Sequence, residues 1–232
     1  MKIALLGYGR MGQEIEKIAL DRGHNIVIKA DLNSSYSITD ADVAIDFSVP
    51  QAAVSNISNC LKNHVPVISG TTGWLDAYED MVSLCEKSEG AFLYASNFSL
   101  GVNITFEINK QLARLMKSQS QYNLEIEEIH HTQKLDAPSG TAISLAEDII
   151  NETNYESWSL DEKADQSIPI TSKRIEGVPG THTITYASDE DSISLNHTAK
   201  NRKGFALGAV IAAEWILGKT GVFSMKDVLN IG

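Results

Sequence analysis

Short apolar runs alternate with segments of helical periodicity over the first hundred residues of the chain. The apolar runs that we interpret as strands cover residues 2–6, 25–30, 43–47, 65–69 and 91–95. Between them, apolar side chains recur three and four positions apart, which is the spacing of one face of a helix. Strands that alternate with helices in this way are typical of a doubly wound parallel sheet.

The helices that join these strands have recognisable beginnings. Pro50 is suited to the first turn of a helix, because the N–H that it lacks would have no partner there. Ser48 is the expected N-cap of that helix. A further helix is expected from about residue 76 to residue 88.

After about residue 103 the pattern changes to longer helices and alternating strands. We expect a long helix through Ile104 and Leu115, and a second helix after Pro138. Polar and apolar residues alternate over residues 124–129, 182–187 and 192–197, as they do in strands with one solvated face. Consecutive strands of this kind favour a separate mixed or antiparallel sheet.

A glycine-rich loop follows the first predicted strand. Gly7, Gly9 and Gly12 form G-x-G-x-x-G between that strand and a helix, which is the context of the dinucleotide fingerprint. The first glycine permits a tight turn, the second lets a pyrophosphate approach the backbone, and the third lets helix and strand pack closely. The phosphates would bind at the N-terminus of the helix, where free N–H groups point outward. The whole loop, including Tyr8, Arg10 and Met11, is therefore a candidate cofactor site.

Asp31 ends the second predicted strand, nineteen residues after Gly12. An acid at this position is placed to bind the ribose diol of NAD. Leu32 and Asn33 follow it, so no basic residue stands beside it for a 2′-phosphate. We expect NADH to be used at least as well as NADPH. The alternative interpretation of Asp31 is that it simply lies in a surface turn at the end of a strand and binds no cofactor.

Further turns follow the other strands of the first half. The carboxyl ends of parallel strands share one edge of the sheet, where ligands of such folds bind. We therefore expect the segments after the fourth and fifth strands to line the cofactor, and these are Gly70, Thr71 and Thr72, then Ala95, Ser96, Asn97 and Phe98.

The end of the chain is expected to return to the first sheet. Residues 205–217 predict an apolar helix that packs there, and the acidic stretch 151–166 is expected to be a loop or a partial helix. The predicted fold is α/β, with an N-terminal Rossmann-type doubly wound parallel sheet and an inserted α+β domain containing a mixed sheet. Residues 1–103 and 204–232 would bind the dinucleotide, and residues 104–203 would form the substrate-binding domain.

The composition excludes several classes of protein. The 232 residues carry a formal net charge of −11, which argues against nucleic acid as a partner. No apolar run approaches the roughly eighteen residues of a membrane span, and the N-terminal run does not resemble a signal peptide. Cys60 and Cys85 are expected to be buried thiols rather than a disulfide. We therefore expect a cytoplasmic protein with no membrane partner.

Groups that handle carboxylates and protons are concentrated between residues 128 and 142. His130, His131 and Lys134 come from one loop at a strand end. Pro138 is expected to preset the next helix, which leaves the N–H groups of Gly140 and Thr141 free to bind an anion. A substrate with two carboxylates could be held between these two sites.

Two other interpretations of this window are open. The histidines could ligate zinc, but neighbours on a strand do not easily reach one ion, and no further ligand stands at a usual spacing. We therefore expect no metal site. Alternatively the histidines could simply end a strand, which leaves the nearby Lys134 and Gly140–Thr141 turn unexplained.

The run from Glu128 to Ala142, E-I-H-H-T-Q-K-L-D-A-P-S-G-T-A, resembles the signature of bacterial dihydrodipicolinate reductases. The similarity extends over nearly the whole chain, through V-A-I-D-F-S at residues 43–48 and R-I-E-G-V-P-G-T-H at residues 174–182. The glycine loop is one residue shorter than in many members.

The resemblance implies hydride transfer from NADH or NADPH to a cyclic imine dicarboxylate in the diaminopimelate route to lysine. It implies that His130 and Lys134 act as acid–base or proton-donating groups, and that His131, Gly140 and Thr141 bind substrate carboxylates. It also implies a homotetramer built through the sheet of the second domain. Two other hypotheses stay open, namely another small Rossmann imino- or keto-acid dehydrogenase and a non-catalytic NADH-binding sensor.

Overall fold

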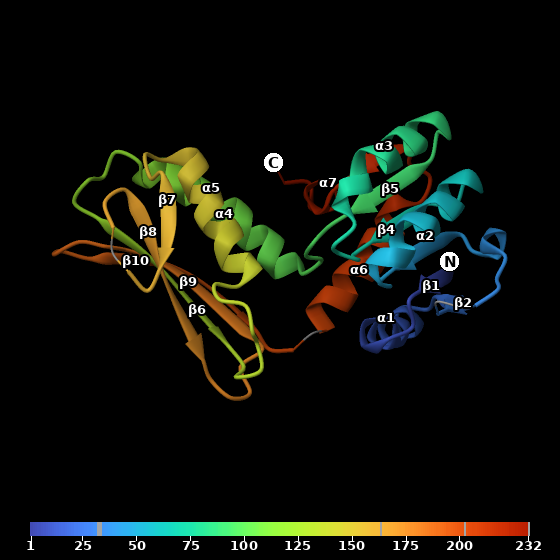
Figure 1. Ribbon diagram of the computed structural model, residues 1–232, viewed down its shortest axis with the longest axis horizontal. Coiled ribbons are helices and arrows are strands. Elements are labelled where there is room, and N and C mark those ends of the chain that lie inside the picture. The colour runs from blue at the N-terminus through green and yellow to red at the C-terminus, as the bar shows by residue number, and fades with distance from the viewer. Residues whose placement is uncertain (32–33, 163, 202, 232) are drawn as a thin grey trace. The chain divides into compact units, whose positions relative to one another are not determined.

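The computed structural model describes residues 1–31, 34–162, 164–201 and 203–231. The chain divides into two units, of which the first comprises Met1–Leu100 with Lys203–Gly232 and the second comprises Gly101–Arg202. Figure 1 shows the elements of both units. Each unit is built around its own sheet. Among the described residues, no helix has both the length and the apolar character needed to cross a bilayer.

Unit 1 contains a six-stranded sheet in the order β11-β5-β4-β3-β1-β2. All of its strand pairs are parallel. The doubly wound parallel sheet predicted from the sequence is thus confirmed. The strands are β1 (Lys2–Leu6), β2 (Asn25–Ala30), β3 (Val43–Asp46), β4 (Val67–Ser69), β5 (Ala91–Tyr94) and β11 (Gly221–Phe223).

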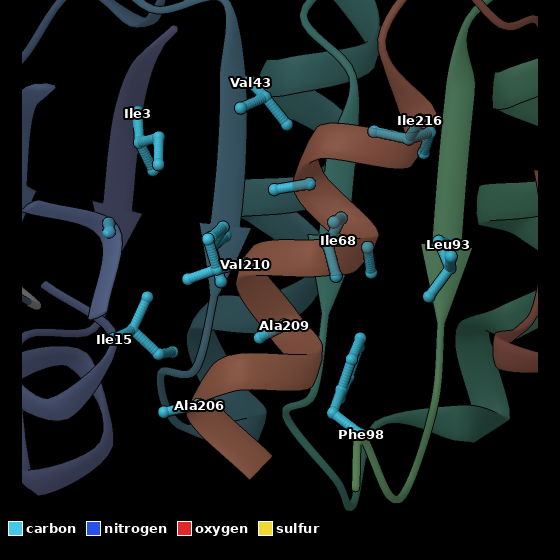
Figure 2. Packing of buried hydrophobic residues seen from close by; sticks show 14 of the residues in the cluster. Ile3, Ile15, Val43, Ile68, Leu93, Phe98, Ala206, Ala209, Val210 and Ile216 are labelled. Atoms are coloured by element: carbon cyan, nitrogen blue, oxygen red, sulfur yellow. The ribbon is translucent and has the colours of Figure 1, made fainter. Parts of the chain in front are cut away.

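Helices cover both faces of this sheet. They are α1 (Arg10–Asp21), α2 (Pro50–Lys62), α3 (Tyr78–Lys87), α6 (Lys203–Ile216) and α7 (Met225–Leu229), with short 3-10 turns at Ile38–Asp40 and Leu75–Ala77. One core joins the sheet to α1 and α6, and another joins it to α2 and α3. The return of the chain through α6 is therefore confirmed. Small residues such as Ala206 and Ala209 let that helix lie close to the strands (Figure 2).

The expected N-cap of α2 was assigned to the wrong residue. Val49 occupies the N-cap position and makes no side-chain capping bond. The Ser48 hydroxyl instead donates to the Asp46 carboxylate at 2.7 Å. Its oxygen accepts from the Asn56 side-chain amide at 3.2 Å. Ser48 also stands one residue before the N-cap, and for both reasons the capping prediction was wrong.

Unit 2 contains a five-stranded mixed sheet in the order β10-β9-β6-β8-β7. β6 pairs parallel with β8 and antiparallel with β9, so the predicted mixed sheet is confirmed. The strands are β6 (Asn123–His130), β7 (Ser157–Leu160), β8 (Ser167–Arg174), β9 (Gly180–Ala187) and β10 (Ser192–Ala199), and the helices are α4 (Leu100–Met116) and α5 (Gly140–Glu152).

Alternation along the strands of unit 2 separates a core face from an open face. Leu124 and Ile126 of β6 and Ile184 of β9 pack with α5 in one apolar core. The residues between them on β6 and β9 are exposed or half-buried. The stretch 151–166 was expected to be a loop or a partial helix, but it contains the strand β7. The core face of β6 is the one that carries Glu128 and His130, which are also buried.

Candidate cofactor and substrate sites

The glycine loop of unit 1 has the geometry that its sequence requires. Gly7 has a φ of +95°, and a Cβ added there would lie 2.2 Å from the carbonyl oxygen of Phe47. A Cβ at Gly12 would lie 2.4 Å from the carbonyl oxygen of Gly7, so helix and loop are in close contact. At Gly9 a Cβ would meet nothing within 4 Å, and the backbone there is open to a ligand. The loop therefore has both the turn and the accessible backbone of a phosphate site.

Asp31 lies beside this loop. Its Oδ1 accepts a hydrogen bond from the backbone N–H of Tyr8 at 3.3 Å. Lys29, the nearest basic residue before it in sequence, forms an ion pair with Glu16 at 2.6 Å. Hydrogen bonds to Glu16 and Tyr8 raise the pKa of Lys29, so its charge is already engaged. Leu32 and Asn33, on which the absence of a neighbouring base rests, lie outside the described residues.

A cleft of about 860 Å³ opens at this edge of unit 1. Of the predicted cofactor residues, it is lined by Gly7, Tyr8, Gly9 and Asp31. The other predicted residues do not line it, and these are Arg10, Met11, Gly12, Gly70, Thr71, Thr72, Ala95, Ser96, Asn97 and Phe98. The cleft adds residues that sequence reasoning missed, namely Ser34, Tyr36, Val49, Gln51, Ala52, Ser55 and Asn56. For the residues on α2, the polar side chains in the first turns of that helix were the available sequence signal.

Asp46 connects the predicted turns to the wall of the cleft. Its carboxylate is fully buried at the end of β3 and accepts hydrogen bonds from Ser48, Asn56, Ser69 and Thr71 at 2.7 to 2.9 Å. Burial raises the pKa of Asp46, although these four donors oppose the shift. Thr71 also accepts from the backbone N–H of Ser48 at 2.9 Å. Thr71 therefore does not line the cleft itself, but its hydrogen bonds hold Asp46 and the cleft residue Ser48 in position.

The segment after β5 packs inward at the same edge. Phe98 is 1% exposed, and its ring centroid lies 5.5 Å from that of Phe47. The Asn97 side chain accepts a hydrogen bond from the backbone N–H of Ser99 at 2.9 Å. A cofactor contact with Phe98 would consequently come from its backbone rather than its ring.

In unit 2, the strand β6 ends at His130 and brings it against Glu128. The His130 side chain is nearly buried, and its Nδ1 contacts Oε2 of Glu128. His131 comes directly after the strand and is half-buried. Lys134 Nζ lies 2.8 and 2.9 Å from the two carboxylate oxygens of Asp136.

The helix α5 begins differently from the prediction. Its first residue is Gly140, and Ser139 is the N-cap, with its hydroxyl accepting from the backbone N–H of Ala142 at 3.2 Å. Pro138 stands before the cap, after a cis peptide bond, and does not form the first helical turn. Within the described part of the chain, the N–H groups of Gly140 and Thr141 have no protein acceptor, as is usual for a first helical turn.

A buried polar network extends from His130 to α5. The ring centroids of His130 and His182 are 5.1 Å apart, and His182 Nε2 lies 2.9 Å from the Ser139 hydroxyl. Burial lowers the pKa of His182 to about 4 and also holds the pKa of His130 below its ordinary value. Both rings are therefore neutral near pH 7 in the free protein. Sequence reasoning gave no role to His182, whose alternation with Ile184 on β9 would have placed it on the core face.

Three of these side chains come close enough to share an ion. Single ligand atoms of Glu128, His130 and His182 lie within 4.8 Å of one another. Arg174 forms an ion pair with Glu128 at 2.9 Å, and Ser139 occupies His182 Nε2. A guanidinium on the carboxylate opposes binding of a second cation, so the group fits an internal ion-pair network better than a metal centre.

The parallel sheet, the glycine loop after β1 and the acid that follows β2 together define a dinucleotide-binding protein of the Rossmann type. Comparison with known proteins identifies the family. The family described as dihydrodipicolinate reductase, N-terminus, matches residues 21–98, and its C-terminal counterpart matches residues 101–229.

Curated relatives agree with this match. The chain is 57% identical to the 4-hydroxy-tetrahydrodipicolinate reductase of Christiangramia forsetii, covering 99% of this chain and 98% of that protein. It is 33% identical to the 4-hydroxy-tetrahydrodipicolinate reductase of Neisseria meningitidis serogroup C, covering 93% of this chain and 84% of that protein. The chain belongs to the dihydrodipicolinate reductase family, and it is an oxidoreductase that uses a nicotinamide dinucleotide.

Solved structures share the fold. The dipicolinate-bound dihydrodipicolinate reductase from Paenisporosarcina sp. TG-14 has a TM-score of 0.80 at 24% identity, covering 97% of each chain. A probable dehydrogenase from Thermotoga maritima has a TM-score of 0.62 at 10% identity, covering 98% of this chain and 92% of that one. At these identities the likeness concerns the fold alone.

Proposed function

We propose that the protein reduces a cyclic imine dicarboxylate, dihydrodipicolinate or its 4-hydroxy-tetrahydro precursor, to tetrahydrodipicolinate in the diaminopimelate route to lysine. The observation that carries this proposal is the grouping of His130, His131 and Lys134 at the end of β6. It is supported by the name of the relative that is 57% identical over almost the whole chain. In dihydrodipicolinate, the ring gains a hydride from NADH or NADPH and one proton from the protein or solvent.

In this proposal His130 and Lys134 supply the proton and offset developing charge. A positioned acid typically contributes a factor of about 10² to 10⁴ to such a step. The pKa of His130 is lowered by burial in the free protein, and a bound dianion would act in the opposite direction by favouring the imidazolium. Lys134 is paired with Asp136, so substrate binding would exchange one carboxylate partner for another.

His131, Gly140 and Thr141 bind the substrate carboxylates in the same proposal. The two backbone N–H groups stand at the start of the thirteen-residue helix α5, where the helix dipole favours an anion by roughly 0.3 to 1 kcal/mol. The Thr141 hydroxyl would add a third donor. The neutral Ser139–His182 pair holds the helix start in place without competing for the anion.

The cofactor site of the proposal comprises the glycine loop from Gly7 to Gly12, Asp31, and the turns Gly70–Thr72 and Ala95–Phe98. Bound NADH or NADPH would supply the hydride. Asp31 would accept hydrogen bonds from the ribose diol, and it would repel a 2′-phosphate while Lys29 stays paired with Glu16. NADH should consequently be used at least as well as NADPH.

We also propose that the protein is a cytoplasmic homotetramer with no nucleic-acid or membrane partner. The open face of the unit 2 sheet is the candidate interface, because its residues on β6 and β9 are exposed or half-buried in one chain. Sedimentation equilibrium of the purified protein measures the oligomer directly, and a monomer would contradict this part of the proposal.

A coupled assay tests the reaction. Purified dihydrodipicolinate synthase supplies the unstable substrate, and NADH loss is followed with the wild type and with His130→Ala and Lys134→Ala. We expect rapid turnover by the wild type, a large loss of kcat in His130→Ala, and loss of both kcat and apparent affinity in Lys134→Ala. NADH binding without oxidation would indicate a sensor. Activity only on another imino or keto acid would indicate a different dehydrogenase.

A further inference from the structure

Glu128 is the most enclosed charged group in the candidate substrate site. It has no exposed surface and lies two residues before His130 on the core face of β6. Its two carboxylate oxygens have different partners. Oε2 contacts Nδ1 of His130, and Oε1 lies 2.9 Å from Nη1 of Arg174.

The ionisation of Glu128 determines which nitrogen of His130 carries a proton. Burial opposes ionisation of Glu128, but the side chains of Ser172, His130 and Arg174 around it hold its pKa below the ordinary value. An ionised carboxylate can only accept hydrogen bonds. Nδ1 of His130 must therefore be the donor, and in the neutral ring Nε2 is left without a proton.

Nε2 points away from Glu128 toward β9. A Cβ added at Gly180 would lie 2.9 Å from Nε2, so the absence of a side chain at this position leaves room beside that nitrogen. About 9% of the His130 residue surface stays accessible. The ring is thus held at one nitrogen, while the other can take up and release a proton.

Arg174 extends the same arrangement to the loop that carries Lys134. Its Nη2 donates to the carbonyl oxygen of Asp136 at 2.7 Å, and its Nε donates to the carbonyl oxygen of Lys134 at 3.3 Å. Nη1 also donates to the carbonyl oxygen of Lys173 at 2.7 Å. A guanidinium that is fixed by a buried carboxylate therefore holds the backbone on either side of residue 135.

We propose that Glu128 is the positioning residue for both candidate acid–base groups: it fixes the His130 ring with Nε2 as the reactive nitrogen, and through Arg174 it holds the loop of Lys134. This inference rests on the proposed function. When the Nε2–H bond of the imidazolium breaks, its proton goes to the reduced substrate. The neutral ring keeps the proton on Nδ1, which still donates a hydrogen bond to Glu128. The charge of Glu128 stabilises the imidazolium before that step.

The decisive variant is Glu128→Gln, which keeps the size of the side chain and removes its charge. The matched control is Glu152→Gln, because Glu152 is also a unit 2 carboxylate in contact with an arginine, at 2.7 and 2.8 Å from Arg114. We expect Glu128→Gln to lower kcat about 10- to 100-fold, which is less than the full factor of about 10² to 10⁴ for a positioned proton donor because His130 itself is kept. The control should keep wild-type kcat, and both variants should bind NADH as the wild type does.

Two readouts separate positioning from a general loss of structure. The charged and titratable groups that face His130 are Glu128, Arg174, Lys134 and His182. Glu128 is the one that raises the pKa of His130, so its removal should move the acid-dependent limb of the kcat profile to lower pH. Nitrogen-15 NMR of the histidine rings should show a protonated Nδ1 for His130 in the wild type and a different tautomer population in Glu128→Gln.

Arg174→Lys tests the link from Glu128 through Arg174 to the loop that carries Lys134. Lysine keeps the charge but lacks the planar fork, so the tautomer of His130 should persist while the apparent KM for the dicarboxylate rises several-fold. Unchanged kcat, pH profile and tautomer in a folded Glu128→Gln protein would overturn the inference. If Glu128→Gln unfolds, a wild-type His130 tautomer with a protonated Nε2 overturns it independently. Near-normal turnover by His130→Ala would instead defeat the proposed function.

Discussion

Replacing Thr71 by valine removes one hydroxyl from the edge of the parallel sheet and changes the side-chain volume little. Thr71 is 5% exposed, and its Oγ1 donates to the buried Asp46 carboxylate at 2.8 Å while accepting from the backbone N–H of Ser48 at 2.9 Å. The valine variant leaves both partners without this contact, and water has little access to replace it.

The magnitude follows from these two bonds. A hydrogen bond to a charged group contributes about 1.5 to 3 kcal/mol and a neutral one about 0.5 to 1.5 kcal/mol. Asp46 keeps the Ser69 donor on the same oxygen, so part of the first loss is compensated. We expect Thr71→Val to lower the free energy of unfolding by roughly 2 to 3 kcal/mol. Because Ser48 and Val49 line the cleft, the Kd for NADH should also rise several-fold.

Urea denaturation followed by circular dichroism measures the stability, and NADH fluorescence titration measures the affinity. The control for the stability measurement is Thr72→Val, since Thr72 is the exposed neighbour of the same residue type. A loss of less than about 0.5 kcal/mol in Thr71→Val, or an equal loss in the control, would refute the account of how Asp46 and Thr71 support the cleft.

Three further predictions follow from burial. Gly208→Ala would place a Cβ 1.7 Å from the carbonyl oxygen of Phe98, and overpacking of this kind should cost about 1 to 3 kcal/mol or more in urea denaturation. Burial lowers the pKa of His182 to about 4 from an ordinary value of 6.5, so the unfolded state takes up a proton first as pH falls. The free energy of unfolding should therefore decrease as pH drops from 6.5 toward 4, and it should decrease less steeply in His182→Gln. Cys60 and Cys85 are free, buried thiols whose pKa values are raised by burial, so they should react with a thiol reagent only in denaturant, and fast labelling of the native protein would count against the packing.

The features that the sequence predicted well are those set by neighbouring residues. Strand–helix alternation and the position of the glycine loop depend on local periodicity and on the steric freedom of Gly7, so both could be read from the chain. The strands that were missed have weak local signals. β11 and β7 are only three and four residues long, and β8 contains Pro169, which is unusual within a strand.

The candidate site was only partly predictable for a different reason. Alternation on β6 places Glu128 and His130 on one face, but their contacts with Arg174 and His182 depend on the register of strands far apart in sequence. In the same way, the cap assigned to Ser48 failed because its hydroxyl is bonded to Asp46 and to Asn56, which the folded sheet edge brings together with it. Register and burial are tertiary properties, and no single segment encodes them.

Transfer of a labelled hydride tests the central claim most directly. The protein is given NADH that carries deuterium at both positions of C4 of the nicotinamide, together with substrate supplied by the synthase, and the product is analysed by mass spectrometry. The account predicts one deuterium in each molecule of tetrahydrodipicolinate. An unlabelled product, or labelled NADH that binds and is never oxidised, would contradict it.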